Sequence, residues 1–119
     1  MWPAEGGRNA GRYVEFKIPV TTGTFAFDMV SVDGGSGGGS NTRWDVVYSL
    51  TADFASPTAL GTALSGAKDT VVASSYQSLG VNITTGQTLY LRVYPYNTGG
   101  ATSGKTLMLA NVIVSGVTN

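Results

Sequence analysis

The sequence of 119 residues contains no cysteine and no histidine, and only 12% of its residues are charged. Without cysteine the chain can form neither a disulfide nor a zinc–thiolate site. Without histidine it lacks the side chain that most often acts as a general acid or base. Seven basic and seven acidic residues give a net charge of zero, which argues against nucleic acid or membrane as a partner. Electrostatic recognition must therefore come from local clusters of charge.

No segment has the 3.6-residue apolar period of a helix, and 17 glycines with many threonine, serine and valine residues favour short strands and turns. We therefore predict an all-β, antiparallel β-sandwich of jelly-roll type with seven or eight short strands. The expected strands lie near residues 14–20, 25–33, 43–50, 59–64, 70–76, 79–83, 89–96 and 107–114. The glycine-rich residues 34–42 are expected to form a loop. We interpret residues 1–11 as an N-terminal linker and residues 12–119 as one domain.

The segment from residue 89 to residue 96 shows the clearest strand pattern. It alternates between an apolar set (Leu89, Leu91, Val93 and Pro95) and a second set (Tyr90, Arg92, Tyr94 and Tyr96). Successive side chains of a strand point to opposite faces, so we expect the apolar set in the core and the second set outside. Tyrosine rings stack on sugars, and arginine binds carboxylates with two parallel hydrogen bonds. Arg92, Tyr94 and Tyr96 are therefore candidate ligand contacts, whereas Trp44 alternates with apolar residues and is expected in the core.

Antiparallel strands reverse direction at each turn, and this assigns the loops to the two ends of the predicted sandwich. Counted from the first strand, the loops at 34–42, 65–69 and 97–104 fall at the same end. Four basic residues are predicted to gather there, namely Arg12, Arg43, Lys68 and Lys105. Lys17 is expected near the opposite end.

Two short motifs match functional patterns but lack the structural context that the chemistry needs. Residues 99–106 match G-x-x-x-x-G-K-[ST], which binds phosphate at the start of a helix, whereas a short β-branched segment follows here. Residues 34–38 match G-x-S-x-G, but Ser36 has no histidine base. The seven carboxylates show no paired spacing. We expect no catalysis and no cofactor, while a structural calcium site built from loop carbonyls and one or two carboxylates stays open.

Three segments together carry a resemblance to a known family: residues 34–49 (GGSGGGSNTRWDVVYS), 89–97 (LYLRVYPYN) and 103–116 (SGKTLMLANVIVSG). From about residue 12 onwards the chain resembles the pectin-binding carbohydrate-binding modules of family 77, which are appended to bacterial pectate lyases and pectin esterases. The resemblance implies a non-catalytic β-sandwich whose basic residues recognise the carboxylates of homogalacturonan. It assigns that role to Arg43, Lys68 and Lys105, which strand direction also places at one end.

The expected function is therefore that of a module that binds pectic polysaccharide and targets a covalently linked catalytic domain to plant cell walls. The resemblance further implies a secreted, extracellular bacterial protein, and we expect a monomer with no nucleic-acid or membrane partner. Two alternatives stay open. One is a module for neutral plant glycans such as xylan or β-glucan, in which the tyrosines dominate. The other is a structural or adhesive domain of a surface protein.

Overall fold

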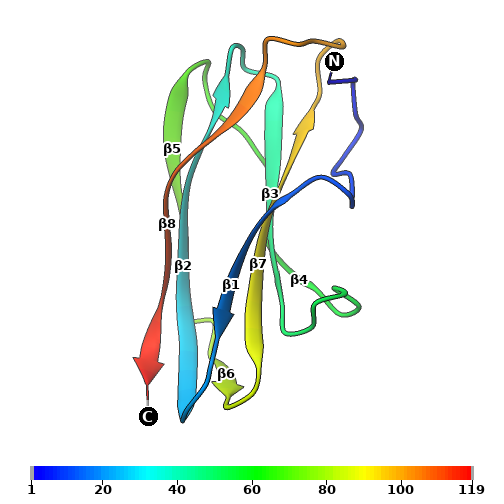
Figure 1. Cartoon of the computed structure of the whole chain (residues 1–119). Helices are drawn as coiled ribbons and strands as arrows, with labels where there is room; N and C mark the ends of the chain where they lie inside the picture. The colour runs from blue at the N-terminus through cyan, green and yellow to red at the C-terminus, as the bar shows by residue number, and fades with distance from the viewer. Residues whose placement is uncertain (1, 119) are drawn as a thin grey trace.

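A computed structural model describes residues 2–118, in which eight antiparallel strands form two sheets that pack face to face (Figure 1). The strands are β1 (Val14–Pro19), β2 (Thr24–Gly37), β3 (Thr42–Ser49), β4 (Thr58–Leu64), β5 (Thr70–Tyr76), β6 (Val81–Thr84), β7 (Thr88–Asn97) and β8 (Thr106–Thr118). The predicted all-β antiparallel sandwich is confirmed. No helix in this part of the chain is long and apolar enough to cross a membrane.

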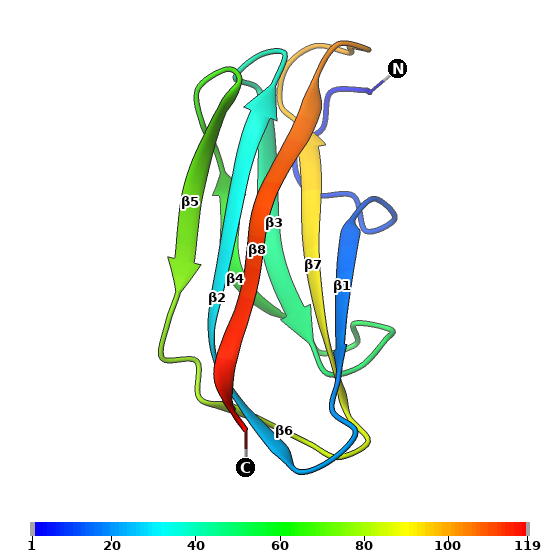
Figure 2. The ribbon, with the colours of Figure 1, turned by 60° about the vertical axis from the view of Figure 1, so that its left-hand side comes forward.

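The two sheets are built around different central strands. In the first sheet the order is β1-β7-β3-β4. In the second sheet β8 follows one side of β2, while β6 and β5 share the other side, β6 along residues 24–27 and β5 along residues 30–36. Figure 2 shows β8 lying along β2 from one end of the sandwich to the other. The long strand β2 therefore organises the whole second sheet.

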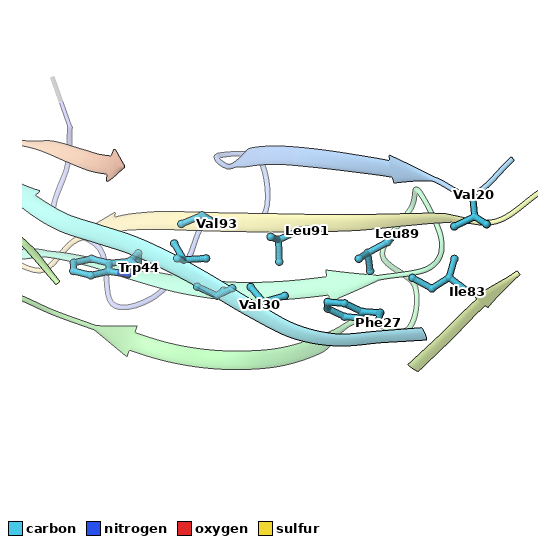
Figure 3. Packing of buried hydrophobic residues seen from close by; sticks show 10 residues of the cluster. Val20, Phe27, Val30, Trp44, Ile83, Leu89, Leu91 and Val93 are labelled. Carbon is cyan, nitrogen blue, oxygen red and sulfur yellow. The ribbon is translucent and has the colours of Figure 1, made fainter. Parts of the chain in front are cut away.

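The core lies between the sheets and follows the period of two that the sequence predicted. β2 contributes Phe27, Val30 and Val32, β3 contributes Trp44 and Val46, and β7 contributes Leu89, Leu91 and Val93, all of them fully buried. Figure 3 shows these side chains in a row, with Trp44 near one end and Ile83 near the other. Burying one such side chain contributes about 1.5–3 kcal/mol to folding. The expectation that Trp44 belongs to the core is confirmed.

The glycine-rich segment differs from the predicted loop, because β2 continues through it to Gly37 and only residues 38–41 join β2 to β3. A β-carbon on Gly34 would lie 2.8 Å from Nε1 of Trp44. Glycine at this position thus lets the indole ring pack directly against the backbone of β2. Gly38, with a φ of +76° and the carbonyl of Gly104 beside it, marks the actual turn.

The N-terminal segment, which we expected to be a linker, packs against the first sheet over its described residues. The backbone of Trp2 exchanges two hydrogen bonds with Thr102, at 2.6 and 2.9 Å, and the amide of Glu5 donates to the carbonyl of Asn97 at 2.7 Å. Arg8 forms an ion pair of 3.0 Å with Asp45 of β3. Residues 2–11 are therefore part of the folded unit. Met1 and Asn119, which the predicted boundaries included, lie outside the described residues.

The hydroxyl of Tyr76, at the end of β5, is buried against Gly61 and has no hydrogen-bond partner among residues 2–118. This burial raises the pKa of Tyr76, and the nearby Ser74 offsets only part of the rise. A buried polar group without a partner costs about 1–3 kcal/mol. We therefore expect Tyr76→Phe to raise the free energy of unfolding by on the order of 1 kcal/mol at neutral pH.

The same substitution tests the pH dependence. Because the folded pKa of Tyr76 lies above its ordinary value of 10.0, the neutral phenol favours the folded state below pH 10.0, and this contribution is lost as the pH rises further. Urea unfolding on both sides of this pH should show a smaller alkaline loss of stability for Tyr76→Phe than for the wild type. Tyr13→Phe is the control, because Tyr13 is 39% exposed as a residue. A less stable Tyr76→Phe at neutral pH would mean that the hydroxyl has a partner.

Candidate functional site

The loop end of the sandwich, as we name the surface formed by residues 38–41, 65–69 and 98–105, brings together three connections between strands (Figure 1). The amide of Gly38 donates to the carboxylate of Asp69 at 2.8 Å, and the amide of Thr98 donates to the carbonyl of Asn41 at 2.9 Å. These hydrogen bonds tie the connection at 38–41 to both of the others. The loop end is therefore one continuous surface, as strand direction predicted.

The structure places Arg43, Lys68 and Lys105 around the connection between β2 and β3. Arg43 donates from Nη1 to the carbonyls of Ser40 at 2.7 Å and of Thr42 at 3.2 Å. The side chain of Lys105 extends from the connection at 98–105 toward the one at 38–41. A β-carbon on Gly39 would lie 3.1 Å from its Cε, and one on Gly99 would lie 2.8 Å from its Nζ. The backbone of Lys68 pairs with that of Ser36, at the end of β2.

Arg43, Lys68 and Lys105 differ from the other basic residues because they have no ion-pair partner within residues 2–118. Four of the seven basic side chains are paired: Arg8 with Asp45 at 3.0 Å, Arg12 with Glu5 at 2.7 Å, Lys17 with Glu15 at 4.0 Å and Arg92 with Glu15 at 2.8 Å. Within residues 2–118, Arg43, Lys68 and Lys105 have no carboxylate oxygen within 4.0 Å. Asp69, beside Lys68, accepts the hydrogen bond from Gly38. The loop end thus carries positive charge that the protein does not pair.

The outward face of β7 is not the open tyrosine surface that we expected. Tyr94 and Tyr96 are only 5% and 7% exposed, and the N-terminal segment covers the ring of Tyr94. The guanidinium of Arg8 lies 5.4 Å from the centre of the Tyr94 ring, and Tyr13 packs against the same ring at 5.5 Å. Burial, together with the charge of Asp45, raises the pKa of Tyr96 despite the nearby arginines. Neither ring presents a free face to a ligand at the loop end.

Arg92 is likewise occupied within the protein. Its guanidinium lies between two aromatic rings, 3.8 Å from the centre of Tyr13 and 3.7 Å from that of Phe54. It donates to Glu15 at 2.8 Å and to the hydroxyl of Tyr94 at 3.0 Å. Burial alone would lower the pKa of Arg92, but the hydrogen bonds with Tyr94 and Glu15 outweigh it and raise the pKa. The geometry gives Arg92 a structural role on the first sheet, away from the loop end.

A groove of about 290 Å³ lies on the same outward face, between the N-terminal segment and the connection from β3 to β4. Arg8 and Ala10 line one side, and Asp53, Phe54 and Pro57 line the other. Phe54 has a φ of 52°, in the left-handed region that a bulky residue rarely adopts. Sequence reasoning missed this groove, because residues 1–11 were interpreted as a linker and an isolated aromatic residue in a loop carries no periodic signal.

The described residues contain no group of three or more His, Cys, Asp or Glu side chains that could hold a metal ion. Fold and surface together define a β-sandwich domain with a cationic loop end. Comparisons of the chain with models of protein families, with curated proteins and with solved structures find no match.

Proposed function

We propose that this domain is a non-catalytic carbohydrate-binding module whose loop end recognises chains of uronic acid, in particular the homogalacturonan of pectin. The observation that carries the proposal is the unpaired charge of Arg43, Lys68 and Lys105 around one connection. A polyuronate presents a carboxylate on every ring, so several separated cations match it better than a single one. Hydrogen bonds between such groups are charge-assisted and about twice as strong as neutral ones.

The local geometry supports this role for two of the three cations. The bonds from Arg43 to Ser40 and Thr42 hold the guanidinium in place while leaving other N–H groups free. The stem of Lys105 lies against Gly39 and Gly99, which limits the freedom of its ammonium group. Ordering before binding reduces the entropy that association costs. Lys68 is exposed and adds a third positive charge at the edge of the surface.

The resemblance to family 77 modules extends the proposal to the whole protein. In this proposal the domain is a monomer, covalently linked to a pectin-degrading catalytic domain of a secreted bacterial protein, and it brings that enzyme to plant cell walls. It needs no cofactor, and its partner is the polysaccharide rather than nucleic acid or a membrane. The unpaired positive charge of the loop end favours neither of the two alternatives for this surface, neutral glycan binding or an adhesive role.

Native affinity gels test the proposal. The chain should be retarded by de-esterified homogalacturonan, with a dissociation constant of about 1 μM to 1 mM, and less by fully methyl-esterified pectin. Retardation should weaken as salt is added, because exposed charges are screened with a Debye length of about 10 Å at 0.1 M. A repeat with chelator separates direct binding from a calcium bridge. Binding to homogalacturonan that ignores salt, or a preference for xylan that is lost in Lys68→Ala/Lys105→Ala, would contradict uronate recognition at the loop end. Retention by none of the polysaccharides would favour a structural or adhesive domain.

A further inference from the structure

The groove on the first sheet combines apolar walls with hydrogen-bonding groups of both kinds. Val47 of β3 and Pro57 line it without polar side-chain atoms, and Phe54 adds an aromatic wall. Arg8 donates from Nη1 to Asp45, which leaves its other N–H groups as donors for a ligand. The hydroxyl of Tyr94 accepts from Arg92 and keeps its own proton to donate. Asp53 supplies an acceptor at the rim, because its carboxylate accepts the amide of Ala55 at 3.0 Å and keeps further lone pairs for a ligand.

The charged groups of the lining do not favour an anion as the natural ligand. Arg8 and Arg92 are each neutralised by an ion pair, with Asp45 and Glu15. Asp53 has no such partner among the described residues, and the hydrogen bonds from Ala55 and Thr51 lower its pKa, so that it stays ionised. Among the charged residues that line the groove, Asp53 is therefore the one that no ion pair neutralises, and its carboxylate would repel an anion.

The aromatic rings of the groove do not favour a ligand cation. Phe54 already has the guanidinium of Arg92 at 3.7 Å from its centre, and Tyr94 has that of Arg8 at 5.4 Å. Rings engaged in this way cannot form a cage around a ligand cation. A neutral ligand rich in hydroxyl groups remains, because it needs both donors and acceptors over an apolar wall.

We infer that this groove binds one ring of a neutral saccharide, at a second site that is independent of the cationic loop end. Its volume of about 290 Å³ lies at the lower limit of ligand pockets, about 300–1,000 Å³, which suits a single ring. In this site Asp53 accepts hydrogen bonds from sugar hydroxyls, Arg8 and Tyr94 donate to sugar oxygens, and Phe54 and Pro57 cover the C–H face. The domain would thus recognise neutral sugars and uronates on different surfaces.

Titration of the ¹⁵N-labelled chain with neutral xylo-, gluco- and galacto-oligosaccharides, followed by NMR, tests the second site. At least one probe should shift the amides of Val47, Phe54 and Arg92, and added salt should leave the affinity unchanged. Phe54→Gly removes the wall, while glycine adopts the positive φ without strain, and Asp53→Asn removes the charge. Each variant should bind the probe about tenfold more weakly. Asp28→Asn, on an exposed carboxylate of β2, is the matched control and should bind normally.

Testing the variants of each site with the ligand of the other site shows whether the two sites are independent. Lys68→Ala/Lys105→Ala should bind the neutral probe as the wild type does, and Phe54→Gly should keep its retardation by homogalacturonan. The groove proposal is overturned if no neutral probe shifts its amides up to about 10 mM, beyond the weakest useful affinities. It is also overturned if the shifts map to the loop end, if Phe54→Gly binds normally, or if tetramethylammonium or galacturonate occupies the groove instead. If homogalacturonan does not retard the chain in the affinity gels, each of these outcomes can still be observed.

Discussion

Alanine at Arg43, Lys68 or Lys105 is expected to weaken homogalacturonan binding about ten- to a hundredfold, and Lys68→Ala/Lys105→Ala together should abolish retardation in the affinity gel. A hydrogen bond to a charged group contributes about 1.5–3 kcal/mol, and each 1.4 kcal/mol corresponds to about a tenfold change in affinity. Binding that is weak at the outset therefore cannot survive two such losses. Isothermal titration with de-esterified oligogalacturonides measures the size of each loss.

Lys17→Ala is the matched control for these variants. The side chain of Lys17 is 64% exposed and lies 4.0 Å from Glu15 on β1, so the substitution removes the same charge away from the loop end. Lys17→Ala and Lys68→Ala should melt close to the wild type, because exposed substitutions usually change stability by about 0.5 kcal/mol or less. Arg43 and Lys105 are half-buried, so melting curves of their variants separate a loss of binding from a loss of folding. Equal losses in all four variants would show that overall charge holds the polysaccharide, and a loss in Lys17→Ala alone would place the site away from the loop end.

The largest expected effect on stability follows from Trp44. Trp44→Ala removes the largest fully buried side chain of the domain, and comparable substitutions cost about 3–5 kcal/mol. Since single domains are stable by only about 5–15 kcal/mol, this variant should be largely unfolded at moderate urea concentrations. Gly34→Ala should be destabilised by about 1–3 kcal/mol, because its new methyl group meets the indole ring. Urea unfolding followed by circular dichroism measures both losses.

Gly100→Ala is the control for Gly34→Ala, since a β-carbon on Gly100 would meet nothing within 4 Å. The contact itself can be isolated by combining Gly34→Ala with Trp44→Phe, whose smaller ring leaves room for the methyl group. The loss for the double variant should fall short of the sum of the single losses by about 0.5–3 kcal/mol. Strict additivity, or equal stabilities of Gly34→Ala and Gly100→Ala, would show that the indole does not require glycine at residue 34.

Alternation of side chains was sufficient to predict which residues of β3 and β7 enter the core. Leu89, Leu91 and Val93 lie inside because a strand can bury only one set of alternate residues when its other face looks outward. Counting the reversals of strand direction was sufficient to predict that Arg43, Lys68 and Lys105 lie at the same end of the sandwich. Both inferences use local geometry that each strand carries in its own sequence.

Contacts between distant, non-periodic segments could not be predicted in this way. Nothing in the sequence near Arg8 indicates that it pairs with Asp45 and covers Tyr94, so the tyrosines seemed exposed. For a related reason, the sequence did not predict that β2 extends through Gly34. Glycine usually marks a turn, and only the size of the indole across the sheet explains its presence within a strand.

The order of strands in the two sheets has a consequence for synthesis of the chain on the ribosome. Among the eight described strands, β3 and β4 are the one pair that is adjacent both in the sequence and in a sheet. β1 needs β7, and β2 needs β8 along nearly its whole length. Such non-local pairing slows folding and leaves strand edges open to aggregation. The nascent domain therefore cannot close its second sheet until β8 has left the exit tunnel, so chaperones that shield β2 during this interval should increase the yield of folded protein.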